Sequence, residues 1–255
     1  MKRTIAIVAG GDSSELVVSL RSAQGLYSFI DKERYNLYIV EMEGHRWEVV
    51  LPDGSKTPID RNDFSFMENG EKKQFDFAYI TIHGTPGENG ILQGYFDLLG
   101  IPYSSCNVLV SAMTFNKFTC NQYLKGFGIR VAESLILRKG FEITDEEVIN
   151  KIGLPCFIKP NAGGSSFGVT KVKTKEDIQP AIEKAFEESD EVMIEAFMRG
   201  TEIGGTDLIC IFDAHIKIYG HRVFSAQFIG SSCFGQHLLV HNLQRDLLAS
   251  GHLRV

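Results

Sequence analysis

The chain has 255 residues, of which 44% are hydrophobic and 23% charged, and its formal net charge is −6. This composition is typical of a globular protein, and the negative charge argues against a nucleic-acid role built on phosphate neutralisation. Five cysteines, an odd number without a C-x-x-C pair, predict neither a disulfide framework nor a zinc site and favour a reducing, cytoplasmic setting. Apolar runs are too short for a membrane span or a signal peptide, so neither is expected.

The first part of the chain predicts an α/β domain with a parallel sheet. Its order of strand, glycine-rich turn, helix and strand is that of a βαβ unit. Strands are expected at 4–9, 35–42, 75–82 and 101–103, helices at 16–30 and 90–99, and a hairpin at 46–51. Residues 53–74 are polar and predict an irregular surface excursion.

Two glycine-rich loops follow the first strand and the strand at 75–82. Gly10–Glu15 supplies helix-capping residues, and the loop that begins at His83 also carries Glu88. Because parallel strands end at one edge of a sheet, both loops are expected at that edge, where ligands of such sheets bind. A tight turn with a helix cap, and a structural histidine, account for the same residues, so both interpretations stay open.

The middle of the chain predicts an α+β domain, a small sheet with two helices on one side. A helix at 106–128, with Asn116 and Lys117 inside it, leads into this domain, and the domain boundary is placed near residue 115. The other predicted elements are strands at 134–137, 155–159, 169–172 and 191–198 and helices at 144–152 and 175–189, the latter capped by Thr174.

Residues 157–172 are the strongest functional signal. A strand ending at Lys159 leads into a loop of small residues that includes Ser165 and Ser166, and a second strand follows. Backbone N–H groups without Cβ obstruction, two hydroxyls and a lysine are suited to hold phosphate oxygens. No Gly-Lys-Ser/Thr opens a helix afterwards, so this is not a Walker loop. An ordinary hairpin with glycines at positive φ is the alternative.

Several motifs, in one order, resemble the D-alanine–D-alanine ligase family of ATP-grasp enzymes over residues 1 to about 203. They are Gly10-Gly-Asp-Ser-Ser-Glu-x-x-Val-Ser19, His83-Gly-x-x-Gly-Glu-x-Gly-x-x-Gln-Gly94, Gly100-Ile-Pro-Tyr103, Asn116-Lys117, Ile158-Lys159-Pro160 with Gly164-Ser-Ser-x-Gly168, and Glu195-x-Phe197 with Gly200-Thr-Glu202. Asn89, where the family usually has aspartate, and Leu16, where a polar residue often stands, depart from the pattern.

The resemblance implies three domains: an N-terminal α/β domain at 1–115, a central ATP-grasp domain at 116–195, and a third domain, here truncated or replaced, at 196–255. It implies ligation of two D-alanines through an acyl phosphate for peptidoglycan synthesis, with ATP, magnesium or manganese, and a homodimer. It also implies these roles: Glu15 and His83 near the first D-alanine, Ser165 at the reacting group with Ser166 beside it, Lys117 and Lys159 on the ATP phosphates, Glu195, Phe197 and Met198 around adenine, and Glu202 on the ribose. Taken singly, surface lysines, a helix-cap Glu15 and a strand-end Glu195 would explain the same residues.

The tail after Ile203 does not match the resemblance. Residues 204–255 contain no glutamate, a single lysine and five of the chain's seven histidines. The Asp and Glu-x-Asn that ligate two magnesium ions in the family are not found there, so little or no ligase activity is expected. A frame disruption and true divergence both explain the change. His237 and His241 have metal-ligand spacing, but the glutamate of His-Glu-x-x-His is absent.

Three functions therefore remain in competition. The first is the D-alanine–D-alanine ligase, and the second is a non-catalytic remnant that binds nucleotide. The third is a sister ligase that joins D-alanine to D-lactate or D-serine.

Overall fold

The computed structural model describes residues 2–164 and 166–200. The described residues divide into two compact units, 2–112 and 113–200, and each is described by itself below. The predictions for Ser165, Glu202, the His237/His241 pair and the tail at 204–255 lie outside the described residues.

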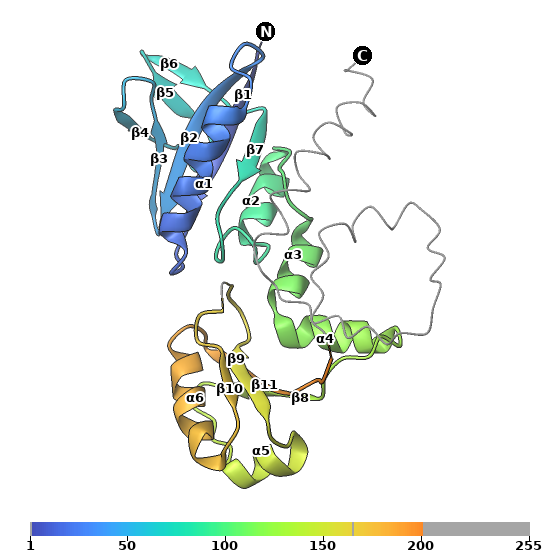
Figure 1. Ribbon diagram of the computed structural model, residues 1–255. Coiled ribbons are helices and arrows are strands. Elements are labelled where there is room, and N and C mark those ends of the chain that lie inside the picture. The colour runs from blue at the N-terminus through green and yellow to red at the C-terminus, as the bar shows by residue number, and fades with distance from the viewer. Residues whose placement is uncertain (1, 165, 201–255) are drawn as a thin grey trace. The chain divides into compact units, whose positions relative to one another are not determined.

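The first unit is built on a five-stranded sheet in the order β4-β3-β2-β1-β7 (Figure 1). The central strand β1 (Arg3–Gly10) runs parallel to β2 (Tyr35–Glu43) on one side and to β7 (Phe77–Ile80) on the other. The predicted parallel sheet is thus confirmed for these three strands. The hairpin partners β3 (Arg46–Val50) and β4 (Lys56–Pro58) extend the sheet antiparallel, so the whole sheet is mixed.

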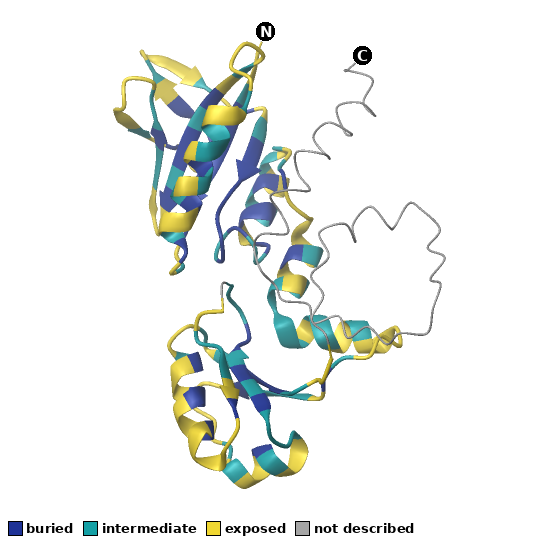
Figure 2. Cartoon of the chain, in the orientation of Figure 1, coloured by how far each residue is buried: buried dark blue, intermediate teal, exposed yellow. Residues whose placement is uncertain are grey.

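Both faces of β1 are buried, which explains its unbroken apolar sequence. Ile7 and Ala9 pack with Ala23 of helix α1 (Leu16–Phe29) on one face. Ala6 and Val8, which point to the other face, belong to a larger core with helix α2 (Ile91–Leu99). Figure 2 shows this buried centre as a dark-blue band along the sheet.

The prediction of an irregular surface excursion at 53–74 is wrong for the central part of this segment. Besides β4, the segment holds the two-stranded sheet of β5 (Phe66–Glu68) and β6 (Glu71–Lys73). Phe64 and Phe66 are buried, and their ring centroids lie 4.9 Å from Phe96 and 5.1 Å from Phe75 respectively. Two aromatic anchors therefore bind a polar segment to the core. The predicted strand at 101–103 is reduced to one bridge between Ala78 and Tyr103.

The second unit is a four-stranded antiparallel sheet in the order β10-β9-β11-β8. Helices α5 (Asp145–Lys151) and α6 (Ile178–Phe186) contribute Val148, Ile178 and Ile182 to a core with the strands, as an α+β unit requires. The strands are β8 (Ser134–Arg138), β9 (Cys156–Pro160), β10 (Thr170–Val172) and β11 (Glu191–Ala196). Ile158 and Ile194 lie on the core face, and the alternation of strand residues turns Lys159 and Glu195 to the opposite face.

The single helix predicted at 106–128 is two helices. Helix α3 (Val108–Phe115) and helix α4 (Lys117–Gly126) are separated by Asn116, whose backbone is extended with φ −87° and ψ 101°. The Asn116 side chain accepts a hydrogen bond from the Thr119 N–H, which makes it the N-cap of α4. The predicted helix at 175–189 likewise begins with a 3₁₀ turn at Lys175–Asp177, and Thr174 donates to Asp177 and forms no N-cap bond.

Candidate functional site

The two glycine-rich loops of the first unit meet at the carboxyl edge of its sheet. The Asp12 N–H donates to the Thr85 carbonyl at 2.9 Å, and the Ser13 hydroxyl donates to the His83 carbonyl at 2.8 Å. The prediction that both loops share one edge is therefore confirmed. Within the second loop, the Gly84 N–H donates to the Glu88 carboxylate at 2.8 Å, so Glu88 fixes the loop backbone.

The turn after β1 has room only for glycine at its first position. Gly10 has φ +101°, and a Cβ built on it would lie 2.2 Å from the Met42 carbonyl oxygen of β2. The next N–H, that of Gly11, donates to the same carbonyl at 2.7 Å. This close approach brings the chain across the end of β2 and delivers Glu15 to the sheet edge.

Glu15 and His83 are the two titratable groups that this edge buries, with 3% and 5% of each residue exposed. Burial lowers the pKa of His83 below its ordinary value, although the nearby Glu15 carboxylate acts in the opposite direction. The imidazole is therefore neutral at pH 7. A carboxylate can bind an ammonium group. A neutral imidazole beside it has one donor nitrogen and one acceptor nitrogen for hydrogen bonds.

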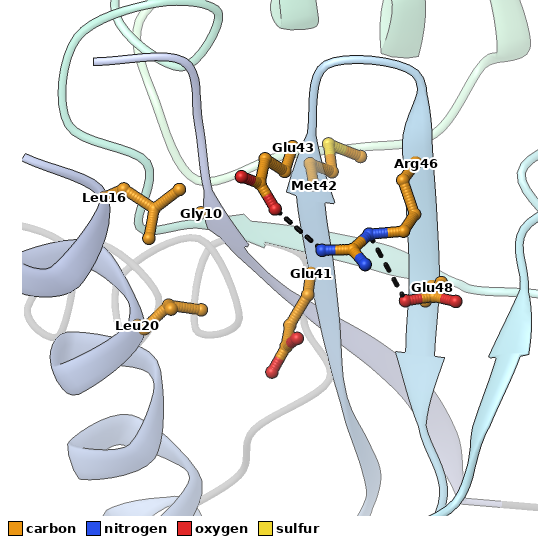
Figure 3. A pocket seen from close by; sticks show the side chains of 8 residues that line it. All are labelled: Gly10, Leu16, Leu20, Glu41, Met42, Glu43, Arg46 and Glu48. Atoms are coloured by element: carbon orange, nitrogen blue, oxygen red, sulfur yellow. Dashed lines mark hydrogen bonds and ion pairs between the residues drawn. The ribbon is translucent and has the colours of Figure 1, made fainter. Parts of the chain in front are cut away.

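A small hollow between α1, β2 and β3 is lined in part by Gly10 of the same turn (Figure 3). Its volume is about 40 Å³, and its lining includes Glu41, Glu43 and Glu48. Arg46 bridges two of them, at 2.7 Å from Glu43 and 3.8 Å from Glu48. The hollow holds neither Glu15 nor His83, is too small for a nucleotide, and presents acidic groups that repel phosphate.

The second unit places two of the predicted lysines in defined contacts. Lys159 lies on the face of the sheet opposite α6, and its Nζ is 2.5 Å from Oε2 of Glu195 on β11. Their side chains are only 12% and 7% exposed. Lys117, the first residue of α4, donates from Nζ to the Gly163 carbonyl at 2.7 Å. An ammonium has three N–H donors, so each lysine can also bind an anion.

The loop after β9 presents backbone donors. Within residues 2–164 and 166–200, the N–H groups of Ala162, Gly163 and Gly164 donate to no protein acceptor. Gly163 has φ +119° and Ser166 has φ +60°, so the loop follows a left-handed path that few residues adopt. Strands β9 and β10 pair antiparallel around this loop, as predicted. The loop thus fits a phosphate group on the chemistry of its donors.

Aromatic side chains lie beside the ion pair. Phe197 is 6.0 Å from Phe157 between ring centroids, and Lys171 Nζ stands 3.6 Å from the centre of the Phe197 ring. Met198 is partly exposed. The sequence argument did not select Phe157 or Lys171. The alternation of side chains along a strand could have indicated both residues. Lys171 on β10 pairs with Phe157 on β9, so the two side chains lie on the same face of the sheet.

Two family models match the chain, the N-terminus of D-ala D-ala ligase over residues 4–106 and its C-terminus over residues 123–226. The chain belongs to the D-alanine–D-alanine ligase family. This family is one of ATP-dependent ligases. The second match continues to residue 226, beyond residue 203, where the family motifs of the sequence end.

Family members include a D-alanine–D-alanine ligase of Bacteroides fragilis, 76% identical over 203 residues, which are 80% of this chain and 63% of the relative. The chain therefore spans less than two thirds of that relative. Among solved structures, D-alanyl-alanine synthetase A from Vibrio cholerae has a TM-score of 0.68 and 32% identity, covering 78% of this chain and 60% of that one. The VanG D-Ala:D-Ser ligase from Enterococcus faecalis has a TM-score of 0.67 and 30% identity, covering 78% and 64%.

The family resemblance implies magnesium, but the described residues contain no set of ligands for it. No three His, Cys, Asp or Glu side chains gather closely enough there to hold a metal ion. Nor does the described part of the chain contain a helix that is long and apolar enough to cross a membrane.

Proposed function

We propose that the chain acts in the ATP-dependent ligation of two D-alanines to D-alanyl-D-alanine, through an acyl phosphate, for peptidoglycan synthesis. One observation carries the nucleotide half of this proposal. Lys117 and the N–H groups of residues 162–164, which donate to no acceptor among residues 2–164 and 166–200, belong to one loop base, with Lys117 Nζ 2.7 Å from the Gly163 carbonyl. Lysine ammonium groups beside free backbone donors stabilise phosphate oxygens.

In the second unit, Lys117 and Lys159 contact the ATP phosphates, and Ser166 and Ser165 donate hydroxyl hydrogen bonds from the loop. Glu195 holds Lys159 in place through their ion pair, which supports this assignment. Glu195, Phe197 and Met198 lie around the adenine, whose faces stack on aromatic rings. Glu202 accepts from the ribose hydroxyls. These roles come from the resemblance, and Ser165 and Glu202 lie outside the described residues.

In the first unit, the Glu15 carboxylate binds the ammonium group of the first D-alanine. Its burial supports the assignment, because a buried carboxylate gains most from a cationic partner. His83, neutral at pH 7, orients the same substrate by a hydrogen bond. The proposed domains are 1–115, 116–195 and 196–255, and the proposed setting is a cytoplasmic homodimer.

A non-catalytic nucleotide-binding remnant is the second candidate. The observation that favours it is the composition of residues 204–255, which contain no glutamate and so no Glu-x-Asn to ligate magnesium. We therefore propose low turnover for this chain by itself. Joining D-alanine to D-serine, the activity in the name of the VanG relative, or to D-lactate, is a third candidate that differs in the second substrate.

The test uses the purified full chain and two measurements, the Kd of ATP by calorimetry and D-alanine-dependent ADP release. We expect ATP binding that Lys159→Met weakens at least tenfold. Lys184→Met is the control, because Lys184 is an exposed residue of α6, which packs on the other face of the sheet. ADP release on the order of 1–10³ s⁻¹ would refute low turnover and the remnant. Equal Kd values for wild type and Lys159→Met would refute the phosphate site, and a preference for D-serine or D-lactate would favour the third candidate.

A further inference from the structure

A network of polar side chains lies where β9, β11 and α4 meet in the second unit. Its hub is Glu191, the first residue of β11. Oε1 of Glu191 accepts from Arg138 Nε at 3.0 Å, and Oε2 accepts from Asn161 Nδ2 at 2.8 Å. Asn116 Nδ2 is a more distant donor to Oε2, at 3.5 Å. Arg138 above all holds the pKa of Glu191 below its ordinary value, so this hub is ionised at neutral pH.

Asn161 joins this hub to helix α4. It is the residue after β9, it is 1% exposed, and its backbone and side chain are both engaged. Its own N–H donates to the Glu191 carbonyl at 2.8 Å, and its carbonyl accepts from the Lys117 N–H at 3.0 Å. Its side-chain Oδ1 accepts from the Phe118 N–H at 2.8 Å. One asparagine therefore spans three segments of the chain.

The first turn of α4 is consequently closed to anions. A helix begins with N–H groups that have no partner within the helix. In α4 the Lys117 and Phe118 N–H groups donate to Asn161, and the Thr119 N–H donates to Asn116. The helix start therefore binds the base of the loop rather than a phosphate. Lys117 holds the same loop a second time, through Nζ on the Gly163 carbonyl.

We infer that Asn161 and Glu191 are positioning residues, which lock the base of the 161–164 loop onto the start of α4 and so fix Lys117 and the N–H groups of residues 162–164 in a phosphate-binding arrangement. This inference rests on the nucleotide half of the proposed function. Glu191 fixes the rotamer of Asn161 by accepting from Nδ2, which leaves Oδ1 aimed at the helix. Without that bond, the amide is free to turn and the loop loses its alignment with Lys117.

The test swaps the charged residue and the amide residue at the Asn161–Glu191 contact, so that donor and acceptor change places. Asn161→Asp keeps an acceptor for the Phe118 N–H but sets one carboxylate against another at 2.8 Å. Glu191→Gln alone removes the charge and one acceptor. In the double variant, the new glutamine amide can donate to the new aspartate, which restores the contact with the donor and acceptor reversed. Asp190→Asn, at the exposed neighbouring position, is the control for loss of an acidic charge.

Two measurements on the full chain follow these variants, the Kd of ATP and the amide hydrogen exchange of residues 161–168. We expect Asn161→Asp to weaken ATP binding and speed exchange about tenfold or more, since a buried polar contact becomes repulsive. Glu191→Gln has a smaller effect, the double variant recovers most of the loss, and Asp190→Asn matches wild type. Rescue by the second substitution would assign the loss to this contact and not to a general disruption of the unit.

A double variant no better than Asn161→Asp, or an Asn161→Asp protein that binds and exchanges like wild type, would overturn the inference. If the wild-type chain binds no ATP, the proposed function fails, and the exchange measurements alone still decide whether the two residues position the loop. If ATP binds and only exchange responds to the variants, the pair holds the loop but does not position it for nucleotide, and the inference is likewise overturned.

Discussion

The ion pair between Lys159 and Glu195 should cost stability when broken and yet be dispensable for folding. Its two charges are 2.5 Å apart and their side chains are 12% and 7% exposed. Oε2 of Glu195 is buried and makes no hydrogen bond of regular geometry within the described residues, so its compensation there comes from the Lys159 charge. Removing one partner of such a pair leaves an uncompensated buried charge, which costs about 3–5 kcal/mol. Lys159→Met and Glu195→Leu should each destabilise the second unit by about that amount.

The double variant Lys159→Met/Glu195→Leu should recover most of this loss, to within about 1–2 kcal/mol of wild type, because apolar side chains of similar volume avoid the desolvation cost of two charges. It should nevertheless lose ATP binding, since the proposed phosphate contact is gone. We therefore expect stability and nucleotide affinity to separate in this one variant. That separation would identify the ion pair as a functional arrangement that the fold tolerates.

Hydrogen exchange of residues 156–159 and 191–196 is the suitable assay, because Trp47, the chain's single tryptophan, lies in the first unit and does not report on the second. The free energy of opening is read from the protection of strands β9 and β11. Two results would refute the reasoning: single variants within about 1 kcal/mol of wild type, which would mean that the pair is effectively solvated, or a double variant that is as unstable as the sum of the two singles.

Three predictions concern the first unit and use Trp47 fluorescence during urea unfolding. Gly10→Ala should destabilise the first unit by about 2 kcal/mol or more, because the new Cβ clashes with the backbone of β2. Gly25→Ala should stabilise it by about 0.5–1 kcal/mol, because Gly25 lies within α1 and a Cβ there meets no other atom. Equal effects of the two variants would contradict the close approach at Gly10. Ser13→Ala should cost about 1 kcal/mol through the lost bond to the His83 carbonyl, and the exposed Ser14→Ala should cost less; the reverse order would speak against the bridge between the loops. The lowered pKa of His83 means that the folded protein binds fewer protons than the unfolded chain, so the contribution of His83 to the free energy of unfolding is complete above pH 6.5 and falls as the pH drops below that value. His83→Gln should flatten the pH dependence of stability between pH 7.5 and 5.5. An unchanged pH dependence in this variant would assign the effect to other groups.

The sequence was sufficient for the sheet edge of the first unit, because its signals are local. A run of β-branched residues and two adjacent glycines specify strand and turn, and helical spacing specifies the helix that follows. The predicted capping by residues 12–14 is wrong, because α1 begins after Glu15 and no side chain makes a cap bond there. The helix predicted at 144–152 is confirmed as α5, which Thr144 and Glu147 begin with a capping box. Placing Glu15 and His83 at one edge then needed only the rule that parallel strands end together.

The failures concern contacts between residues far apart in the chain. No glycine or proline marks the break at Asn116. The helix start after it is held by Asn161, which accepts from the Lys117 and Phe118 N–H groups, and the Asn116 side chain reaches Glu191 at 3.5 Å. Phe64 and Phe66 looked like isolated aromatics in a polar segment until packing against Phe75 and Phe96 showed what they anchor. Periodicity cannot reveal either effect, because each depends on tertiary structure rather than on neighbours in the sequence.

The bridge from Ser13 to the His83 carbonyl also orders events during synthesis. The two residues are 70 positions apart, and translation at 5–20 residues per second separates them by about 4–14 s. During that time β1 and β2 can pair and α1 can form, because their contacts are closer in sequence. The strand β7 joins the other side of β1 only later, and with it comes the second loop. The edge that gathers Glu15 and His83 is thus among the last parts of this sheet to be completed on the ribosome.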